Sequence, residues 1–70
     1  MDVEKYLKEQ RDREIKNIND PNKRIEWRLC VYFRHIGRLE ALFIADAIDI
    51  DRYSELMTEW YQYWPDMEEK

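Results

Sequence analysis

Hydrophobic residues recur along this chain at the three- and four-residue intervals that are typical of amphipathic helices. Only one Gly and two Pro interrupt its 70 residues, so few secondary-structure elements are expected. The pattern predicts helices at about 2–18, 21–47 and 50–64, followed by an acidic tail at 65–70. We therefore expect a single all-α domain over residues 1–70, a small three-helix bundle with a long central second helix.

The first predicted helix has the weakest hydrophobic side. Its apolar positions are Val3, Tyr6, Leu7, Ile15 and Ile18. Gln10, Arg11 and Glu14 interrupt this stripe. Asp20 is a favourable N-cap, and Pro21 is a favourable first residue, for the helix that follows.

The second predicted helix has two apolar strips. The first follows heptad spacing through Ile25, Leu29, Tyr32, Ile36, Leu39 and Phe43. The second strip lies roughly 80–100° around the helix and contains Phe33, Gly37, Ala41, Ile44 and Ile48. One neighbour cannot cover so wide an arc. The second helix should therefore be central, packed by two helices or by one helix and a second copy of the chain. An interior kink or end at Gly37 is the alternative.

The third predicted helix begins at an acidic junction. Asp49 or Asp51 can cap it, and Asp49 as the cap would pair Ile48 with Tyr53 in a hydrophobic staple. Its apolar side contains Tyr53, Leu56, Met57, Trp60 and Trp64, with Tyr61 and Tyr63 at the edges.

The same junction resembles the turn of helix-turn-helix DNA-binding proteins. Ala45 lies between Ile44 and Ile48, as a small residue does in that family, but Asp49 stands where the family has Gly and Glu55 where it has an apolar residue. Residues 41–70 hold eight acidic and two basic residues, a net charge of −6. A recognition helix with so many acidic residues would be repelled by the phosphates of DNA. Direct binding of nucleic acid is therefore not favoured, and a DNA-binding regulator is kept as the alternative.

The composition excludes several classes of site. Cys30 is the only cysteine and His35 the only histidine, so no internal disulfide is possible, and no metal or cofactor site is expected. Cys30 is predicted to be a buried, inert thiol. The chain has neither a signal-peptide core nor a membrane-length apolar run, which predicts a cytoplasmic protein. His35 has no nucleophile at helical spacing and Gly37 stands alone, so enzyme activity is not expected.

Charge divides the chain into regions of opposite sign. Residues 21–40 carry five bases and two acids, a net charge of +3. Arg24, Arg28, His35 and Arg38 line one stripe of the second predicted helix, flanked by Trp27 and Arg34. This stripe is either a solvated face neutralised by acids of neighbouring helices, or a contact surface through Trp27, Arg34 and Arg38.

The acidic third helix and tail suggest a second contact surface. The carboxylates are those of Asp51, Glu55, Glu59, Asp66, Glu68 and Glu69. They are either a solubilising face or ligands for a basic groove, such as that of a nucleic-acid enzyme, where carboxylates would replace phosphates. Small acidic proteins of phages and mobile elements act in this way as a class.

Together these features predict a helical protein-interaction module that binds and inhibits a larger protein. The expected contact residues are Asp51, Glu55, Glu59, Trp60, Tyr61, Trp64, Trp27, Arg34 and Arg38. Homodimerisation is expected through Phe33, Gly37, Ala41 and Ile44. A structural subunit of a helical assembly is a further alternative.

Overall fold

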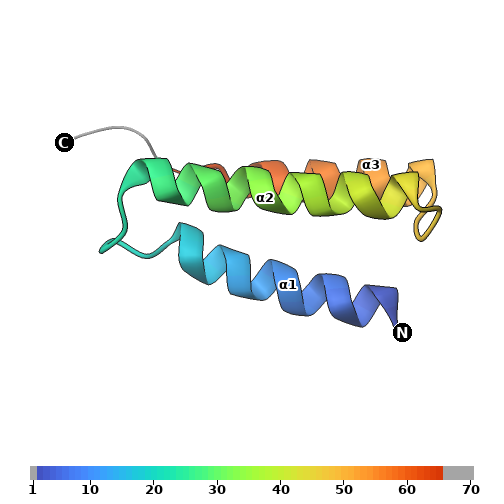
Figure 1. Cartoon of the computed structure of the whole chain (residues 1–70), viewed down its shortest axis with the longest axis horizontal. Helices are drawn as coiled ribbons and strands as arrows, with labels where there is room; N and C mark the ends of the chain where they lie inside the picture. Colours follow the sequence, from blue (N-terminus) through green and yellow to red (C-terminus); the bar gives the residue numbers. More distant parts are fainter. Residues whose placement is uncertain (1, 66–70) are drawn as a thin grey trace.

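The computed structural model describes residues 2–65, and in them the chain forms the predicted all-α bundle. The helices are α1 (Val3–Ile18), α2 (Ile25–Ile44) and α3 (Ile50–Trp60), and the short 3₁₀ helix η1 (Tyr61–Tyr63) extends α3 (Figure 1). The longest is α2, with 20 residues. The acidic residues Asp66, Glu68 and Glu69 of the predicted contact surface lie outside the described residues.

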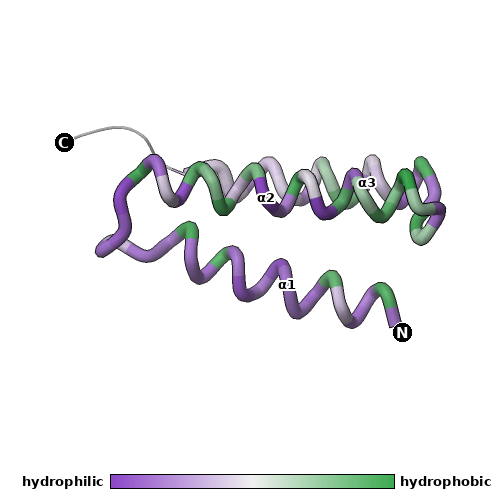
Figure 2. Tube along the Cα trace, viewed as in Figure 1, coloured by the Kyte–Doolittle hydropathy of each residue, from purple (hydrophilic) through white to green (hydrophobic). Residues whose placement is uncertain are grey.

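The central position predicted for α2 is confirmed, because both α1 and α3 pack against it. In Figure 1, α3 returns alongside α2, behind it in this view, and α1 runs below α2. The bundle is elongated, with a longest dimension of 42 Å. Figure 2 shows that α1 is mostly hydrophilic, with isolated hydrophobic positions.

The start of α2 was predicted too early. The helix begins at Ile25, with Arg24 as its N-cap, and not at Pro21. Asp20 instead organises a tight turn: its carboxylate accepts a hydrogen bond from the Asn22 amide at 2.9 Å, and its carbonyl accepts one from the Lys23 amide at 3.2 Å. Asp at the first position and Pro at the second are favoured in such a turn, so the same residues satisfy a competing local structure.

The start of α3 agrees with one of the two predicted caps. The Asp49 side chain accepts a hydrogen bond from the Arg52 amide at 2.8 Å. Ile48 is buried just before this cap and Tyr53 packs against the same cluster, as in a hydrophobic staple. The predicted helix to Trp64 is shorter as an α-helix, because η1 replaces its last turn.

Between α2 and α3 the chain turns through a left-handed residue. Asp46 has φ 61°, its amide bonds to the Phe43 carbonyl at 3.1 Å, and the Ala47 amide bonds to the Leu42 carbonyl at 2.9 Å. This is the hydrogen-bond pattern of a Schellman motif, whose left-handed position usually holds Gly. Aspartate tolerates that conformation better than most residues, which explains how the chain turns here without glycine.

The core consists of two clusters along α2. One joins Ile18 of α1, Val31 and Tyr32 of α2 and Trp60 of α3. The other joins Leu7, Leu39 and Ile48. Each cluster unites residues far apart in the sequence, so burying them fixes both outer helices on the central one.

The second predicted strip of α2 is not covered by either neighbour. Phe33 is 54% exposed and Ile44 is 76% exposed, whereas Ile48 lies past the end of the helix and is buried. The most buried positions of α2 are Val31, Tyr32, His35 and Leu39. At 100° per residue these lie on the opposite side of the helix from Phe33 and Ile44. Both neighbours thus share one broad face of α2.

Replacing Asp46 should change stability according to backbone conformation. Asp46→Gly is expected to raise the free energy of unfolding by about 0.5–1 kcal/mol, and Asp46→Ala to lower it by a similar amount, because only glycine adopts positive φ without strain. Urea denaturation of the three proteins measures this. Asp46→Asn is the matched control, since it removes the charge and keeps the tolerance of positive φ. Equal stability of the Gly and Ala variants would contradict this account of the turn.

Candidate interaction surface

A buried carboxylate joins α1 to α2. Glu14 is 1% exposed, although it was only an interruption of the apolar stripe in the sequence. Arg34 donates two hydrogen bonds to it, from Nε to Oε2 at 2.9 Å and from Nη2 to Oε1 at 3.1 Å. Asn17 donates a third at 3.2 Å, and Arg38 Nη1 lies 3.7 Å from Oε2. A buried charge requires such partners, so this network fixes the middle of α1 on α2.

The same network determines the protonation of Glu14. Burial alone would raise its pKa, but the hydrogen bonds and charge of Arg34, with the contributions of Asn17 and Arg38, hold the pKa below the ordinary value of 4.5. In turn, the hydrogen bonds to Glu14 raise the pKa of Arg34. The pair is therefore ionised at neutral pH.

His35 is buried beside this network and is neutral. Burial, together with the charge of Arg38, lowers its pKa to about 4. Arg38 Nη1 lies 3.1 Å from His35 Nδ1. Because a guanidinium can only donate, Nδ1 accepts this bond and Nε2 carries the proton of the neutral ring. The ring also packs on Trp60, with centroids 4.1 Å apart.

The predicted basic stripe is largely engaged within the fold. Arg34 and Arg38 are bound to Glu14, and Arg28 Nε donates to the carbonyl of Ile18. Arg24 pairs with Glu26 at the surface. One of the two interpretations of this stripe was that acids of a neighbouring helix neutralise its positive charge. The contacts of Arg34 and Arg38 with Glu14 favour that interpretation.

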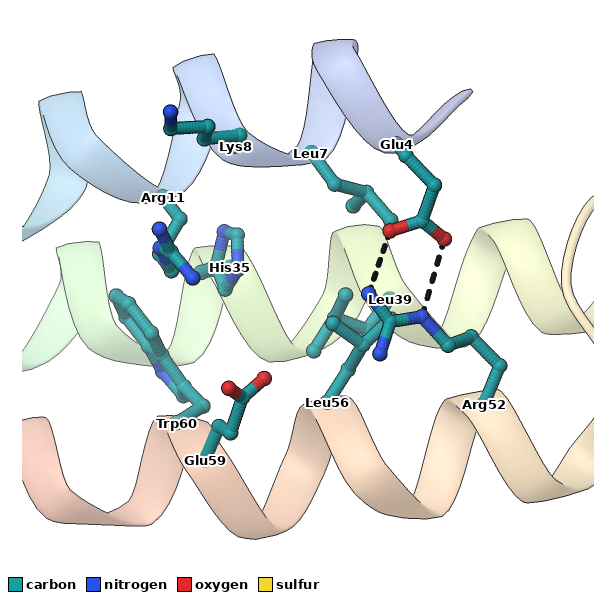
Figure 3. Close-up of a pocket in the computed structure, with 10 residues that line it drawn as sticks. All are labelled: Glu4, Leu7, Lys8, Arg11, His35, Leu39, Arg52, Leu56, Glu59 and Trp60. Carbon is teal, nitrogen blue, oxygen red and sulfur yellow. Dashed lines mark hydrogen bonds and ion pairs between the residues drawn. The ribbon is translucent and has the colours of Figure 1, made fainter. Parts of the chain in front are cut away.

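A shallow groove runs between α1 and α3 above α2 (Figure 3). Its floor contains the buried side chains His35, Leu39 and Trp60, and Arg11 and Glu59 lie on opposite walls. Arg52 of α3 bonds to Glu4 of α1 across the groove, from Nε to Oε2 at 3.0 Å. The cavity is only about 50 Å³, far below the roughly 300–1,000 Å³ of ordinary ligand sites. No Ser, Thr or Cys lines it.

The aromatic residues predicted for a partner surface divide into core and surface. Trp60 is 1% exposed, stacks on Tyr32 and donates from Nε1 to the Tyr32 carbonyl at 3.1 Å. It is therefore a core residue in this fold and not part of an exposed contact surface. Tyr61 and Trp64 are about half exposed, as is Phe33, whose ring meets Trp64 edge-on at 5.8 Å. Trp27 is also on the surface, with Lys23 over its ring.

The acidic residues of α3 lie on its exposed side, with Glu59 at the wall of the groove that faces α1. Asp51, Glu55 and Glu59 are all exposed and are spaced by four residues, so they form one row along the helix. Arg52 lies beside this row, with its Nη1 3.9 Å from Glu55 Oε2, but its closer partner is Glu4. The structure thus brings these three carboxylates together, and separates them from Arg34 and Arg38.

The residues predicted for self-association form an exposed row on α2. Gly37 is exposed, and a Cβ placed on it would meet nothing within 4 Å. Ala41 is exposed between Gly37 and Ile44. Cys30 is also exposed, so the prediction of a buried thiol was wrong. The reason is that its side of α2 is the one that neither α1 nor α3 covers.

The fold itself gives no reason for glycine at position 37. An interior Gly costs about 1 kcal/mol relative to Ala in a helix, and here no neighbouring group requires its small size. Gly37 therefore leaves room for another group to approach this side of α2 closely.

Metal binding and membrane insertion are two further classes of function. Within residues 2–65, no group of three or more potential metal-ligating side chains is assembled, and no helix has the length and apolarity needed to cross a membrane. Comparison with protein-family models, curated proteins and solved structures finds no match. The functional argument therefore depends on the surfaces described above.

Sequence reasoning missed the roles of Glu14 and His35. A signal was present: Glu14 occupies a position of the apolar stripe, one residue before Ile15 and four before Ile18. A carboxylate on that face opposite several arginines of the next helix indicates a buried ion pair.

Stability should fall in mild acid because His35 is neutral when folded. Its folded pKa of about 4 lies below the unfolded value of about 6.5, so the unfolded chain binds a proton first. The stabilisation is complete above pH 6.5 and is lost as pH falls towards 4, by at most about 3 kcal/mol. Glu14 adds a further loss below about pH 4.5, since its pKa is also lowered. Urea denaturation between pH 3 and 7.5 checks both. His35→Gln should flatten the upper part of this profile, and an unchanged slope would contradict the assignment.

Gly37→Ala should stabilise the folded chain by about 1 kcal/mol, because alanine restricts the unfolded backbone and its methyl group meets no neighbour. Chemical denaturation at low micromolar concentration measures this difference. Ala41→Gly, at an exposed position of the same helix, is the matched control and should produce a loss of similar size. Destabilisation by Gly37→Ala would mean that the helix needs glycine for its own conformation.

Proposed function

We propose that this chain is a small cytoplasmic interaction protein that binds and inhibits a larger protein through the acidic outer face of α3. The observation that carries this proposal is the row formed by Asp51, Glu55 and Glu59, all exposed and all on one side of the helix. Tyr61, directly after α3, is also exposed, but it lies about 160° around the helix from Glu59 at 100° per residue and so is not part of this row.

Electrostatics supports a basic groove as the target. Residues 41–70 carry a net charge of −6, from eight acids and two bases. Arg34 and Arg38 are paired with Glu14 and Arg52 with Glu4, whereas Arg11 faces Glu59 across the groove. A surface of one sign attracts a surface of the other sign and speeds their encounter. A nucleic-acid enzyme offers such a groove, and carboxylates bound there would exclude the phosphate backbone. A phage or mobile-element origin fits this role.

A DNA-binding regulator is less well supported. The two helices of a helix-turn-helix cross at about 90–120°, whereas α3 runs back alongside α2 (Figure 1). Its exposed side presents carboxylates, which phosphates repel. A structural subunit of a helical assembly has one observation in its favour, the exposed apolar row of α2 containing Phe33 and Ile44.

Charge reversal on α3 tests the proposal. The tagged chain is used to capture proteins from a lysate of its own source at low salt, and the captured protein is identified and then purified. Glu55→Lys with Glu59→Lys should weaken binding of that purified protein at least tenfold, because both substitutions place like charges against a basic groove. Binding of the unaltered chain should also weaken as salt concentration rises.

Glu9→Lys with Asp12→Lys is the matched control, since it makes the same change of charge on the exposed side of α1. The control should bind like the unaltered chain. An equal loss of binding in both variants would mean that only the net charge of the chain matters. Unchanged binding by the α3 variant would overturn the proposal. A gel shift of duplex DNA by the pure chain, abolished by salt, would instead support the DNA-binding regulator.

A further inference from the structure

The uncovered row of α2 extends along most of the helix. It consists of Cys30, Phe33, Gly37, Ala41 and Ile44, at intervals of three and four residues. Phe33 and Ile44 are 54% and 76% exposed, Cys30 is exposed, and Gly37 has an open space above it. Trp64 continues the row through its edge contact with Phe33. We call this surface the α2 row.

The α2 row is large enough to bind another molecule stably. From the exposed fractions of Phe33, Ile44 and Trp64, its apolar area is on the order of 400 Å². A standard interface covers about 800 Å² on each partner, and somewhat more than half of that is apolar. The row therefore supplies roughly the apolar area that one half of a dimer needs.

We propose that a second copy of this chain covers the α2 row, with the two α2 helices antiparallel and the twofold axis at Gly37. This inference rests on the proposed role of the chain as an interaction protein. The sizes of the side chains match in this arrangement. Gly37 lies opposite the partner's Gly37, Phe33 lies opposite the partner's Ala41, and Cys30 lies opposite the partner's Ile44.

A parallel pair would match sizes poorly. It would place Phe33 against the partner's Phe33 and Ile44 against the partner's Ile44, holding the helices apart where Gly37 and Ala41 leave space. Close packing at protein interior density favours the arrangement that sets large residues opposite small ones. Glycine at the axis then allows the closest approach of the two backbones, which supplies the missing reason for its presence.

Charge at the ends of α2 selects the same direction. Lys23 and Arg24 precede the helix, and Asp46 and Asp49 follow it. Antiparallel pairing brings the basic end of each helix to the acidic end of its partner, whereas parallel pairing brings like charges together. The acidic face of α3 belongs to a helix packed on the other side of α2 and stays outside this interface.

Cross-linking through the native thiol tests both the partner and the direction. In the antiparallel pair, Cys30 and the partner's Cys30 are 14 residues apart along the axis, about 21 Å. Ile44→Cys places a new thiol opposite the partner's Cys30. Under mild oxidation, this variant should form a disulfide-linked dimer in high yield, and the unaltered chain should not. Cys30→Ser with Ile44→Cys is the matched control and should stay unlinked, since its two thiols are again about 21 Å apart.

Light scattering gives the mass without any linkage. The unaltered chain at about 100 μM should have twice its chain mass of 8.8 kDa, and Gly37→Leu and Phe33→Glu should each lower this to one chain mass. Both positions are exposed, so circular dichroism should show unchanged helix content. A disulfide between native Cys30 residues would overturn the antiparallel direction. A monomeric mass for the unaltered chain, with no linkage in Ile44→Cys, would overturn the second copy as the occupant.

The two proposals fail in different ways. A monomer that still binds its captured protein through Glu55 and Glu59 disproves only the pairing of α2. A dimer that binds its captured protein equally well when those two glutamates are replaced disproves only the proposal that the acidic face is the binding surface.

Discussion

The ion pair between Glu14 and Arg34 is the interaction on which the three-helix arrangement depends. The helix that contributes Glu14, α1, has few buried apolar residues, chiefly Leu7 and Ile18 near its two ends. Between them only Ile15 adds apolar contact with the core, and the carboxylate of Glu14 beside it is almost fully buried. Removing one partner of a buried pair leaves the other charge without compensation, which is far more costly than the net gain from making the pair. The pair thus specifies where α1 lies more than it adds to stability.

The hydrogen bonds and ion pairs of the Glu14 carboxylate also affect the charge of the protein surface. It occupies Arg34 and Arg38, which would otherwise be cations available to phosphates, and Arg38 in turn fixes the tautomer of His35. With both arginines paired, the positive charge of this part of α2 is partly neutralised by α1. The external chemistry of the chain follows from its internal pairing.

Much of the architecture was predictable from the sequence, and the failures have specific causes. The cap at Asp49 and the apolar strips of α2 follow from local rules. Pro21 failed as a helix start because Asp20 satisfies a turn as well as it satisfies a cap. The environments of Trp60 and Cys30 depend on which side of α2 the neighbours share, and periodicity does not encode that choice. For the candidate surfaces, the sequence proposed charged and aromatic residues but could not separate arginines paired within the fold from exposed carboxylates.

The burial of Glu14 also has a consequence for how the bundle forms. The α2–α3 hairpin is built from contacts close in sequence and from the Trp60–Tyr32 stack, whereas both core clusters are completed by residues of α1, Ile18 and Leu7. A partly docked α1 would strip water from Glu14 before its hydrogen bonds to Arg34 and Asn17 are made, a state of high free energy. Docking of α1 is therefore cooperative: the first helix is either seated on the hairpin with its network complete or released into water, with no stable position between.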